Sequence, residues 1–470
     1  MEKKQDTSLV REHAERRKRH GSSIDMLNGP LPGKLILFAI PLALSSILQQ
    51  LLNSADASIA GQFVSNYSLA GIGGVTPVTA MFVNLFVGLS IGANVVVAIH
   101  IGAKEFQSIK KAVHTAMALS IVVGLLLGGV GLVISPWVLD AISMPADSLA
   151  DALIYVRLYF CAVPFLTIYN FGSALLRAHG DVKRPLYALA VTVVINLGLD
   201  LAFVCWCGWG TAGIGLATII ATAISAAIIV IFLTHEEEPF RLHWRELGFS
   251  GYELRSIIRI GLPAGIQGAV FSLSNTFIQA TINSFGSAAV AGSSATLNFE
   301  YYTYFFVNAF AQTAVTFTGQ NFAAKKTDRC RAIFKWCLLF GFVSSLVLGI
   351  TFTALGATAL SLFTTDAVAL SYGVVRLWFV ELPDCITTFY EVPAGAMRGM
   401  GWSTLPAVIT ILGSCVLRVV LVAWVFPHFG TWEALMAVYP ITWTAMIIAM
   451  LISYFVVSRR TVRSMAVAKR

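Results

Sequence analysis

Charged residues are scarce in this chain of 470 residues, because Asp, Glu, Lys and Arg together make up only 12%. Soluble globular domains typically carry about 25% of these residues. Together with 57% hydrophobic residues and a mean hydropathy of +0.77, this scarcity excludes a soluble fold. The estimate of domain number from chain length, which holds for soluble proteins, therefore does not apply.

Signatures of catalysis and of metal binding are also missing. The eight His residues lie in tails, loops or helix ends, and neither an HExxH motif nor a nucleophile elbow occurs. The seven Cys residues lack the spacing of a metal site, and we interpret the nearby pair Cys205 and Cys207 as incidental. These absences argue against an enzyme, a resident metal ion and a cofactor.

The net charge of +8 would suit a nucleic-acid partner, but the Lys and Arg residues are confined to short segments between apolar stretches. That placement is typical of membrane topology and not of a nucleic-acid-binding patch. We therefore expect the lipid bilayer as a partner of this chain, and no nucleic acid.

Long apolar stretches are what the sequence does contain. A helix needs about 20 apolar residues to cross the bilayer core, and twelve stretches meet that requirement. The expected helices span 35–60, 74–101, 113–134, 153–177, 185–206, 211–234, 257–285, 293–320, 331–353, 372–397, 405–426 and 432–457. The sequence thus predicts an all-α, multi-pass membrane protein.

The first six stretches resemble the last six. The motif at 38–41 matches the motif at 260–263, and the motif at 156–160 matches that at 375–379. Because six is an even number, both copies enter the membrane from the same side. We expect two six-helix lobes related by a pseudo-two-fold axis along the membrane normal, with a cavity between them. Such a chain suits alternating access and functions as a monomer, whereas a channel would need identical subunits or re-entrant loops.

The charge distribution orients this arrangement. Lys and Arg occupy every second loop and both tails, which places those segments on the cytoplasmic side of the membrane. The expected segments are a basic cytoplasmic tail at 1–34, an N-terminal lobe at 35–234, a cytoplasmic linker at 235–256, a C-terminal lobe at 257–457 and a second basic tail at 458–470.

Polar residues at membrane depth are the candidates for function, because charge there is costly and usually faces a cavity or a partner. Gln49, Asn53 and Asp56 share one helix face at spacings of i, i+4 and i+7, and Asn196 and Asp200 share another at i, i+4. Counted along the helices, both Asp residues fall in the outer half of the bilayer. We expect the two carboxyl groups to meet inside the first lobe.

Two carboxyl groups and an amide in a dry pocket form a candidate ion-coupling site at Asp56, Asn196 and Asp200. Burial and mutual repulsion favour the protonated form of at least one carboxyl group, so the site can carry a proton. With further oxygens the same groups could hold Na⁺. The alternatives are an interfacial position for Asp56 and a purely structural hydrogen bond between helices for Asn196.

The second lobe is not a chemical copy of the first, because its first helix carries amides and no acid. Candidate residues for a substrate cavity are Gln49, Asn53, Asn275, Gln279, Asn283, Glu300 and Tyr301. Nearby aromatic residues could stack on flat cations, although such residues more often pack or face lipid. Arg418 is expected to form a structural ion pair with Glu300 or Glu381.

Several short motifs, in order, resemble those of the multidrug and toxic compound extrusion (MATE) family. They cover essentially the whole chain from residue 27 to 457. The matching segments are Phe38-Ala-Ile-Pro-Leu42, Asn53-Ser-Ala-Asp56 with Gly61, Leu176-Arg-Ala-His-Gly-Asp181 with Pro185, Asn196-Leu-Gly-Leu-Asp200, Gly319-Gln-Asn321 with Lys325, and Gly395-Ala-Met-Arg-Gly399 with Pro406.

The resemblance implies a V-shaped, two-lobed antiporter that exports organic cations or other amphipathic drugs in exchange for protons, or alternatively Na⁺. It is strongest to the prokaryotic branch with its ion site in the N-terminal lobe, where the family's acidic and amide positions match Asp56, Asn196 and Asp200. The chain departs from the branch with an acidic seventh helix, because Asn275 and Gln279 stand there.

Two other functions remain open at this stage. A flippase of a lipid-linked precursor would share the superfamily, but it would favour a cavity rich in Lys and Arg. A membrane-embedded enzyme or sensor lacks support, because no catalytic constellation and no soluble domain is evident in the sequence.

Overall fold

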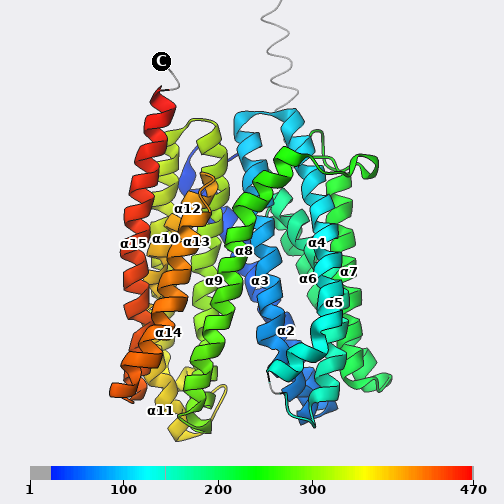
Figure 1. Cartoon of the computed structure of the whole chain (residues 1–470), viewed down its shortest axis with the longest axis vertical. Helices are drawn as coiled ribbons and strands as arrows, with labels where there is room; N and C mark the ends of the chain where they lie inside the picture. The colour runs from blue at the N-terminus through cyan, green and yellow to red at the C-terminus, as the bar shows by residue number, and fades with distance from the viewer. Residues whose placement is uncertain (1–22, 143, 468–470) are drawn as a thin grey trace, which may run out of the picture.

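The computed structural model describes residues 23–142 and 144–467, and these residues form a bundle of long helices (Figure 1). Most of the expected tail at 1–34 and the end of the tail at 458–470 lie outside the described residues. The long helices form because nearly every residue of these stretches is apolar, and a helix satisfies all of its backbone groups internally where no water is present.

Six helical segments form the first lobe. They are α2 (Leu31–Ile59) continued by the π-helical turn η1 (Ala60–Val64), α3 (Asn66–Ala103), α4 (Phe106–Ala141), α5 (Leu149–His179), α6 (Lys183–Leu201) continued by the π-helical turn η2 (Ala202–Trp206), and α7 (Gly210–Thr234). The linker that follows contains the short 3₁₀ turn η3 (Trp244–Glu246). Each of the six helical spans encloses its predicted range and is longer than that range.

The second lobe is more irregular. Four of its helices are continuous, namely α8 (Gly251–Asn283), α9 (Ser287–Ala323), α10 (Thr327–Leu360) and α15 (Trp432–Val467). Between α10 and α15, a first series consists of α11 (Ala367–Arg376), η4 (Leu377–Glu381), η5 (Leu382–Thr387) and α12 (Thr388–Gly399). A second series consists of α13 (Thr404–Thr410), η6 (Ile411–Leu417), α14 (Arg418–Val420), η7 (Leu421–Val425) and η8 (Phe426–His428). The two series are single predicted spans that the structure divides by π and 3₁₀ turns.

Ten helical segments of the described residues are long and apolar enough to cross a membrane. Two predicted spans do not reach that level of hydropathy. Helix α9 has 37 residues and is long enough, but it is rich in Thr, Asn and Gln. The segment at 372–397 is interrupted around Pro383, and every residue of α12 except Phe389 is buried. Polar residues are tolerated in these two segments because they face protein and not lipid.

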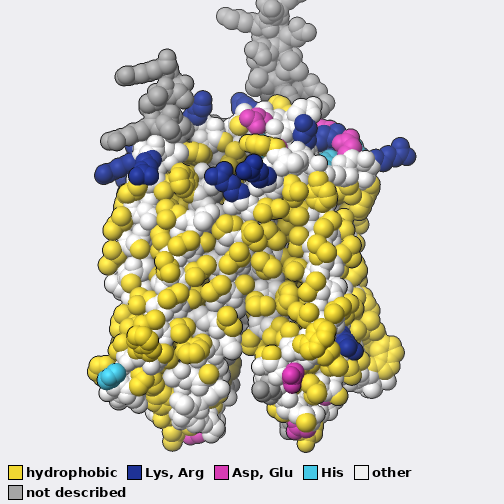
Figure 2. Space-filling model, in the orientation of Figure 1, with side chains coloured by type: hydrophobic (Ala, Val, Ile, Leu, Met, Phe, Trp, Pro, Cys, Tyr) yellow, Lys and Arg dark blue, Asp and Glu magenta, His cyan; other side chains and the backbone are white. Residues whose placement is uncertain are grey.

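The two lobes touch along α3 and α8 at one end of the molecule and separate toward the other end (Figure 1). The space-filling view shows the resulting notch between them (Figure 2). At the contact, Gly88 and Gly92 of α3 face Gly265 and Gly261 of α8. A Cβ atom added at Gly88 would lie 2.1 Å from the nitrogen of Gly265, so only glycine permits this approach of the two backbones.

A short segment before α2, residues 24–29, connects the lobes at the same end; we call it the N-terminal strap. Its Ile24 N–H donates to the carbonyl oxygen of Gly180 in the first lobe, at 3.0 Å. From the second lobe, Lys326 Nζ and Arg329 Nη1 donate to backbone carbonyl oxygens of the strap at 2.8 and 2.9 Å. The strap thus fastens both lobes at the end where they touch.

Lys and Arg side chains gather at this closed end (Figure 2). The linker is attached there to the first lobe, where Lys110 Nζ lies 2.8 Å from Glu246 Oε2. The hydrogen bond from Lys110 holds the pKa of Glu246 below its ordinary value. The basic end and the open end are therefore opposite ends of one molecule, as expected if they face opposite sides of a membrane.

We predict that the basic, closed end faces the cytoplasm. Single-Cys variants at Lys110 and Asp147, made in a background without the seven native Cys residues, test this in intact cells with a membrane-impermeant maleimide. Asp147→Cys should be labelled at once, and Lys110→Cys only after the membrane is permeabilised. Labelling of Lys110→Cys but not of Asp147→Cys in intact cells would reverse the orientation.

Candidate functional site

The first lobe brings Asp56 of α2 and Asp200 of α6 together around the side chain of Asn196. Both neighbours of the Asn196 amide are acceptors, so its nitrogen faces them and donates to Asp56 Oδ1 and Asp200 Oδ2, each at 3.1 Å. The two carboxyl groups also interact directly. All three side chains are buried, with at most 4% of any residue exposed. They form a closed polar cluster inside an apolar lobe.

Two residues that the sequence analysis did not single out complete this cluster. Thr218 of α7 lies with its Oγ1 3.4 Å from Asp56 Oδ2, and Tyr155 of α5 also interacts with the Asp56 carboxyl group. Both are buried. Thr218 stands in a helix with several similar Thr and Ser residues, and Tyr155 in a helix with two other Tyr residues, so spacing alone offers no signal for either.

One oxygen of the cluster has no protein partner. Asp200 Oδ1 is buried and has no hydrogen-bond partner among the described residues. A buried carboxylate oxygen without a donor is costly, and taking up a proton or binding a cation removes that cost. The cluster therefore has both the second carboxyl group and the free acceptor position that an ion-carrying site requires.

The helices that carry the two acids change form directly beyond them. Asp56 lies four residues before the π-helical turn η1, and Asp200 lies two residues before the π-helical turn η2. π-helical turns inside α-helices occur frequently at functional sites, because the wider turn leaves backbone groups less tightly bonded. Both acids thus lie next to a turn of the kind that is frequent at functional sites.

The second lobe contains a separate cavity with a volume of about 180 Å³. Four of the predicted cavity residues line it, namely Asn275, Gln279, Glu300 and Tyr301. The other three do not: Gln49 is half-buried and Asn53 exposed on α2 of the first lobe, and Asn283 is exposed at the end of α8. Asn53 and Asn275 lie at the same spacing after the repeated Pro residues, so they occupy corresponding positions of α2 and α8. Only Asn275 lines a cavity, because the neighbouring helices pack differently in the two lobes.

The predicted pairing of Arg418 is wrong. Glu300 forms its ion pair with Arg376, with Nε–Oε1 and Nη2–Oε2 distances of 2.6 and 2.8 Å, and Glu381 accepts from Thr303 Oγ1 at 2.5 Å. Arg418 Nη1 instead points to Asn275 Oδ1 at 3.4 Å. The physical reason is helix packing: α11 lies against α9, which places Arg376 beside Glu300, whereas Arg418 faces α8.

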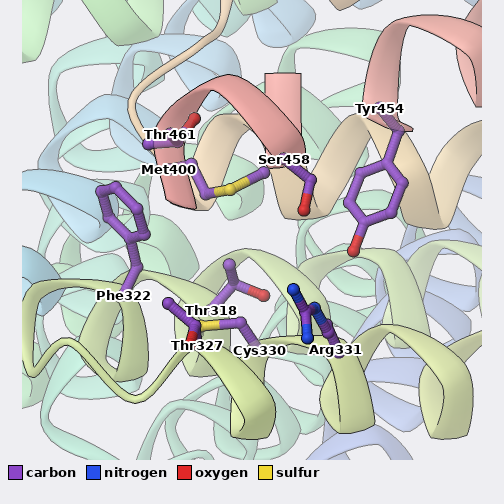
Figure 3. Close-up of a pocket in the computed structure, with 9 residues that line it drawn as sticks. All are labelled: Thr318, Phe322, Thr327, Cys330, Arg331, Met400, Tyr454, Ser458 and Thr461. Atoms are coloured by element: carbon purple, nitrogen blue, oxygen red, sulfur yellow. The ribbon is translucent and has the colours of Figure 1, made fainter. Parts of the chain in front are cut away.

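A smaller pocket lies near the basic end of the second lobe, between α9, α10 and α15 (Figure 3). Cys330, Arg331 and Tyr454 are among its lining side chains. Its volume of about 20 Å³ has room for a water molecule but not for an organic substrate. Metal binding finds no support either, since no group of three or more His, Cys, Asp or Glu that could hold an ion occurs in the described part of the chain.

Comparison with known proteins adds a decisive observation. The sequence profile of the MatE family matches residues 41–202 and again residues 263–424, one copy in each lobe. The chain belongs to the MATE family. It is therefore a multi-pass membrane transporter built by duplication and not an enzyme, and MATE transporters need no cofactor.

The relatives and solved structures agree with this assignment. The chain is 25% identical over 407 residues to the probable multidrug resistance protein YoeA of Bacillus subtilis, covering 85% of this chain and 88% of the relative. It is 21% identical to the probable multidrug resistance protein NorM of Thermotoga maritima, over 81% and 82% of the two chains. An outward-facing structure of a multidrug resistance MATE transporter matches 93% of this chain and 97% of its own, with a TM-score of 0.84 and 20% identity.

We predict that Asp56→Asn and Asp200→Asn each abolish uphill transport while the protein still folds. An amide fills the same space and keeps a hydrogen bond, so the free energy of unfolding should change by no more than about 1 kcal/mol. The amide cannot exchange a proton, so accumulation of a dye in everted vesicles should fall to the level of vesicles without the protein.

Asp140→Asn is the matched control, because Asp140 is exposed near the end of α4, outside the cluster. It should transport at the rate of the unchanged protein. Transport at that rate by well-inserted Asp56→Asn and Asp200→Asn proteins would show that the cluster does not couple transport to an ion.

Proposed function

We propose that this MATE protein is a secondary active efflux antiporter that exports amphipathic organic compounds, with organic cations as the class its family resemblance implies, in exchange for protons. The observation that carries the proposal is the buried cluster of Asp56, Asn196 and Asp200 in the first lobe, with its unpartnered carboxylate oxygen. The names of the relatives support multidrug export.

The arrangement of the lobes supports alternating access. The lobes touch at the basic end and are open at the other, which corresponds to an outward-facing state if the basic end is cytoplasmic. In such a transporter the two lobes rock about the site between them, and each state exposes the site to one side of the membrane. Both termini would then lie in the cytoplasm of the prokaryotic cell, and one chain would suffice for transport.

The proton is the coupling ion that the cluster favours over Na⁺. Sodium requires several oxygen ligands that converge on it, but the Asn196 amide turns its nitrogen toward both carboxyl groups and so acts as a donor. A proton requires only one carboxyl oxygen, and Asp200 Oδ1 is available. Two adjacent buried carboxyl groups also repel each other when both are charged, which favours keeping one proton in the pair.

Exchange requires that the proton and the drug oppose each other's binding, and such coupling is reciprocal. The ion cluster lies inside the first lobe, and its helix α2 also contacts α9 of the second lobe. A change in the protonation of Asp56 can therefore act on the contact between the lobes through α2. This is the physical route by which proton release would change access to the drug site.

We predict that drug binding releases protons from the detergent-solubilised protein. Addition of a cationic dye to weakly buffered protein should lower the pH measured with an indicator, and Asp56→Asn should abolish the change while dye binding persists. Export that runs on a sodium gradient alone, with the pH clamped and without proton release on dye binding, would identify Na⁺ as the coupling ion instead.

A further inference from the structure

We propose that the cavity of the second lobe binds aromatic compounds through a carboxylate or similar anionic group held by Arg418. Because it names a substrate class, the proposal rests on the proposed export function. Binding of the ligand can nevertheless be measured without transport. It extends the expected substrates from cations to aromatic acids and to zwitterions, which carry both charges.

The central observation is a buried guanidinium group with unused donors. Arg418 is 1% exposed and lines the cavity. Its Nη1 atom has only the long contact of 3.4 Å with Asn275, and its Nε and Nη2 atoms have no hydrogen-bond partner among the described residues. Buried charged groups are normally paired, so this arrangement leaves a place for a partner that is not part of the chain.

Two aromatic rings stabilise the positive charge of Arg418 without accepting hydrogen bonds from its N–H groups. The Arg418 guanidinium carbon lies 4.7 Å from the ring centroid of Tyr439 and 5.9 Å from that of Phe271. Such contacts stabilise a cation through the face of the ring. The N–H groups in the plane of the guanidinium stay free, and these are the groups that bind a carboxylate with two parallel hydrogen bonds.

The other charges of the cavity do not neutralise Arg418. Arg376 and Glu300 neutralise each other in their ion pair. Asp384 also lines the cavity, but the charged groups that act on it are carboxyl groups, those of Glu381, Glu300 and Glu391. A buried carboxyl group can become neutral by taking up a proton, whereas an arginine in a protein keeps its charge. The positive charge of Arg418 is therefore the one left uncompensated.

The size and lining of the cavity indicate the rest of the ligand. Its volume is about 180 Å³, and Phe271, Tyr390, Tyr439 and Trp443 are among its lining residues. A cavity of about 150 Å³ is large enough for a benzene ring. The cavity thus has room for a flat ring system of one or two rings, and the guanidinium group fixes the position of the acid group.

The test measures binding of three probes that share one ring system and differ in charge. 2-Naphthoate is anionic, 2-naphthamide is neutral, and 2-naphthylmethylamine is cationic. Each is titrated by calorimetry into the full-length protein in a neutral detergent. We expect 2-naphthoate to bind at least about tenfold more tightly than 2-naphthamide, because charge-assisted hydrogen bonds are roughly twice as strong as neutral ones. The amine should bind most weakly of the three.

Substitution assigns the preference to one side chain. Arg418→Gln should reduce the affinity for 2-naphthoate to that for 2-naphthamide, with the affinity for the amide unchanged. Arg418→Lys keeps the charge but loses the paired donors, so it should prefer the acid by a smaller factor. The matched control is Arg157→Gln, which removes an exposed arginine from α5 of the first lobe and should leave all three affinities unchanged.

Equal affinities of the unchanged protein for acid and amide would overturn the proposal, as would an unchanged affinity of folded Arg418→Gln for the acid. The comparison of the three probes on the unchanged protein remains decisive even if Arg418→Gln does not fold. Asp56→Asn separates this proposal from the export mechanism, because it should bind 2-naphthoate normally and yet fail to export. Absence of 2-naphthoate binding in a protein that still exports dyes would refute only the anion site.

Discussion

The hydrocarbon core of a membrane offers no hydrogen-bonding partner, so each polar group at that depth must find its partner inside the protein. This constraint explains why the polar side chains of the chain gather in a few clusters and why those clusters lie within the lobes. The Asp56 cluster and the Arg376 pair satisfy most of their groups internally. Among the described residues, the buried atoms without a hydrogen-bond partner include Asp200 Oδ1 in the first lobe and, in the second, two nitrogens of Arg418 together with Glu381 Oε2 and Asp384 Oδ2. The second lobe thus leaves both donors and acceptors unpaired.

The two lobes share an architecture but have diverged in chemistry. The N-terminal lobe has undivided helices, two of which end in π-helical turns, and one acidic cluster where helices α2, α5, α6 and α7 converge. The C-terminal lobe has two divided helices, and Glu381, Asp384 and Arg418 all lie in or beside the irregular turns. Irregular backbone at membrane depth is tolerated where it is enclosed by protein or lines a cavity. Duplication therefore supplied two similar frames, and substitution gave one frame a buried acidic cluster and the other a cavity lined by charged and aromatic side chains.

Much of this arrangement could be predicted from the sequence. Apolar length and repeated motifs identified the lobes, because both depend on residues that are near one another in the chain. The spacing of Asn196 and Asp200 placed them on one helix face for the same reason. The partners of Arg418 and the role of Thr218 could not be predicted, because they depend on how helices rotate and pack against each other. Charge identifies a buried arginine, but it does not indicate which of several acids lies across from it.

The contact between the lobes suits the proposed alternating-access mechanism, in which the angle between the lobes changes. Glycine backbones of α3 and α8 touch directly, so a change of angle between the lobes displaces few interlocked side chains. Polar contacts join the two lobes at the same end, including His100 Nε2 of α3 with Glu253 Oε2 of α8 at 2.9 Å, and in that mechanism they would stabilise the closed end. The contact between the lobes thus has two parts, a close glycine contact of the helix backbones and a set of polar side-chain contacts.

The N-terminal strap also fastens the two lobes at this end, and it is held both by hydrogen bonds to its main chain and by the side chain of Met26, which is 1% exposed and packs in the hydrophobic core. Lys326, Arg329 and Asn321 of the second lobe donate to its carbonyl oxygens, and Gly180 of the first lobe accepts from its amide. Every amino acid carries the same carbonyl group, so the exposed positions of the strap can vary in sequence without losing these hydrogen bonds, whereas Met26 fills an apolar site in the core. The donors on the second lobe have no such freedom. Divergence among close homologues should therefore be tolerated at the exposed positions of the strap and restricted at Met26 and at the basic residues that bind the strap.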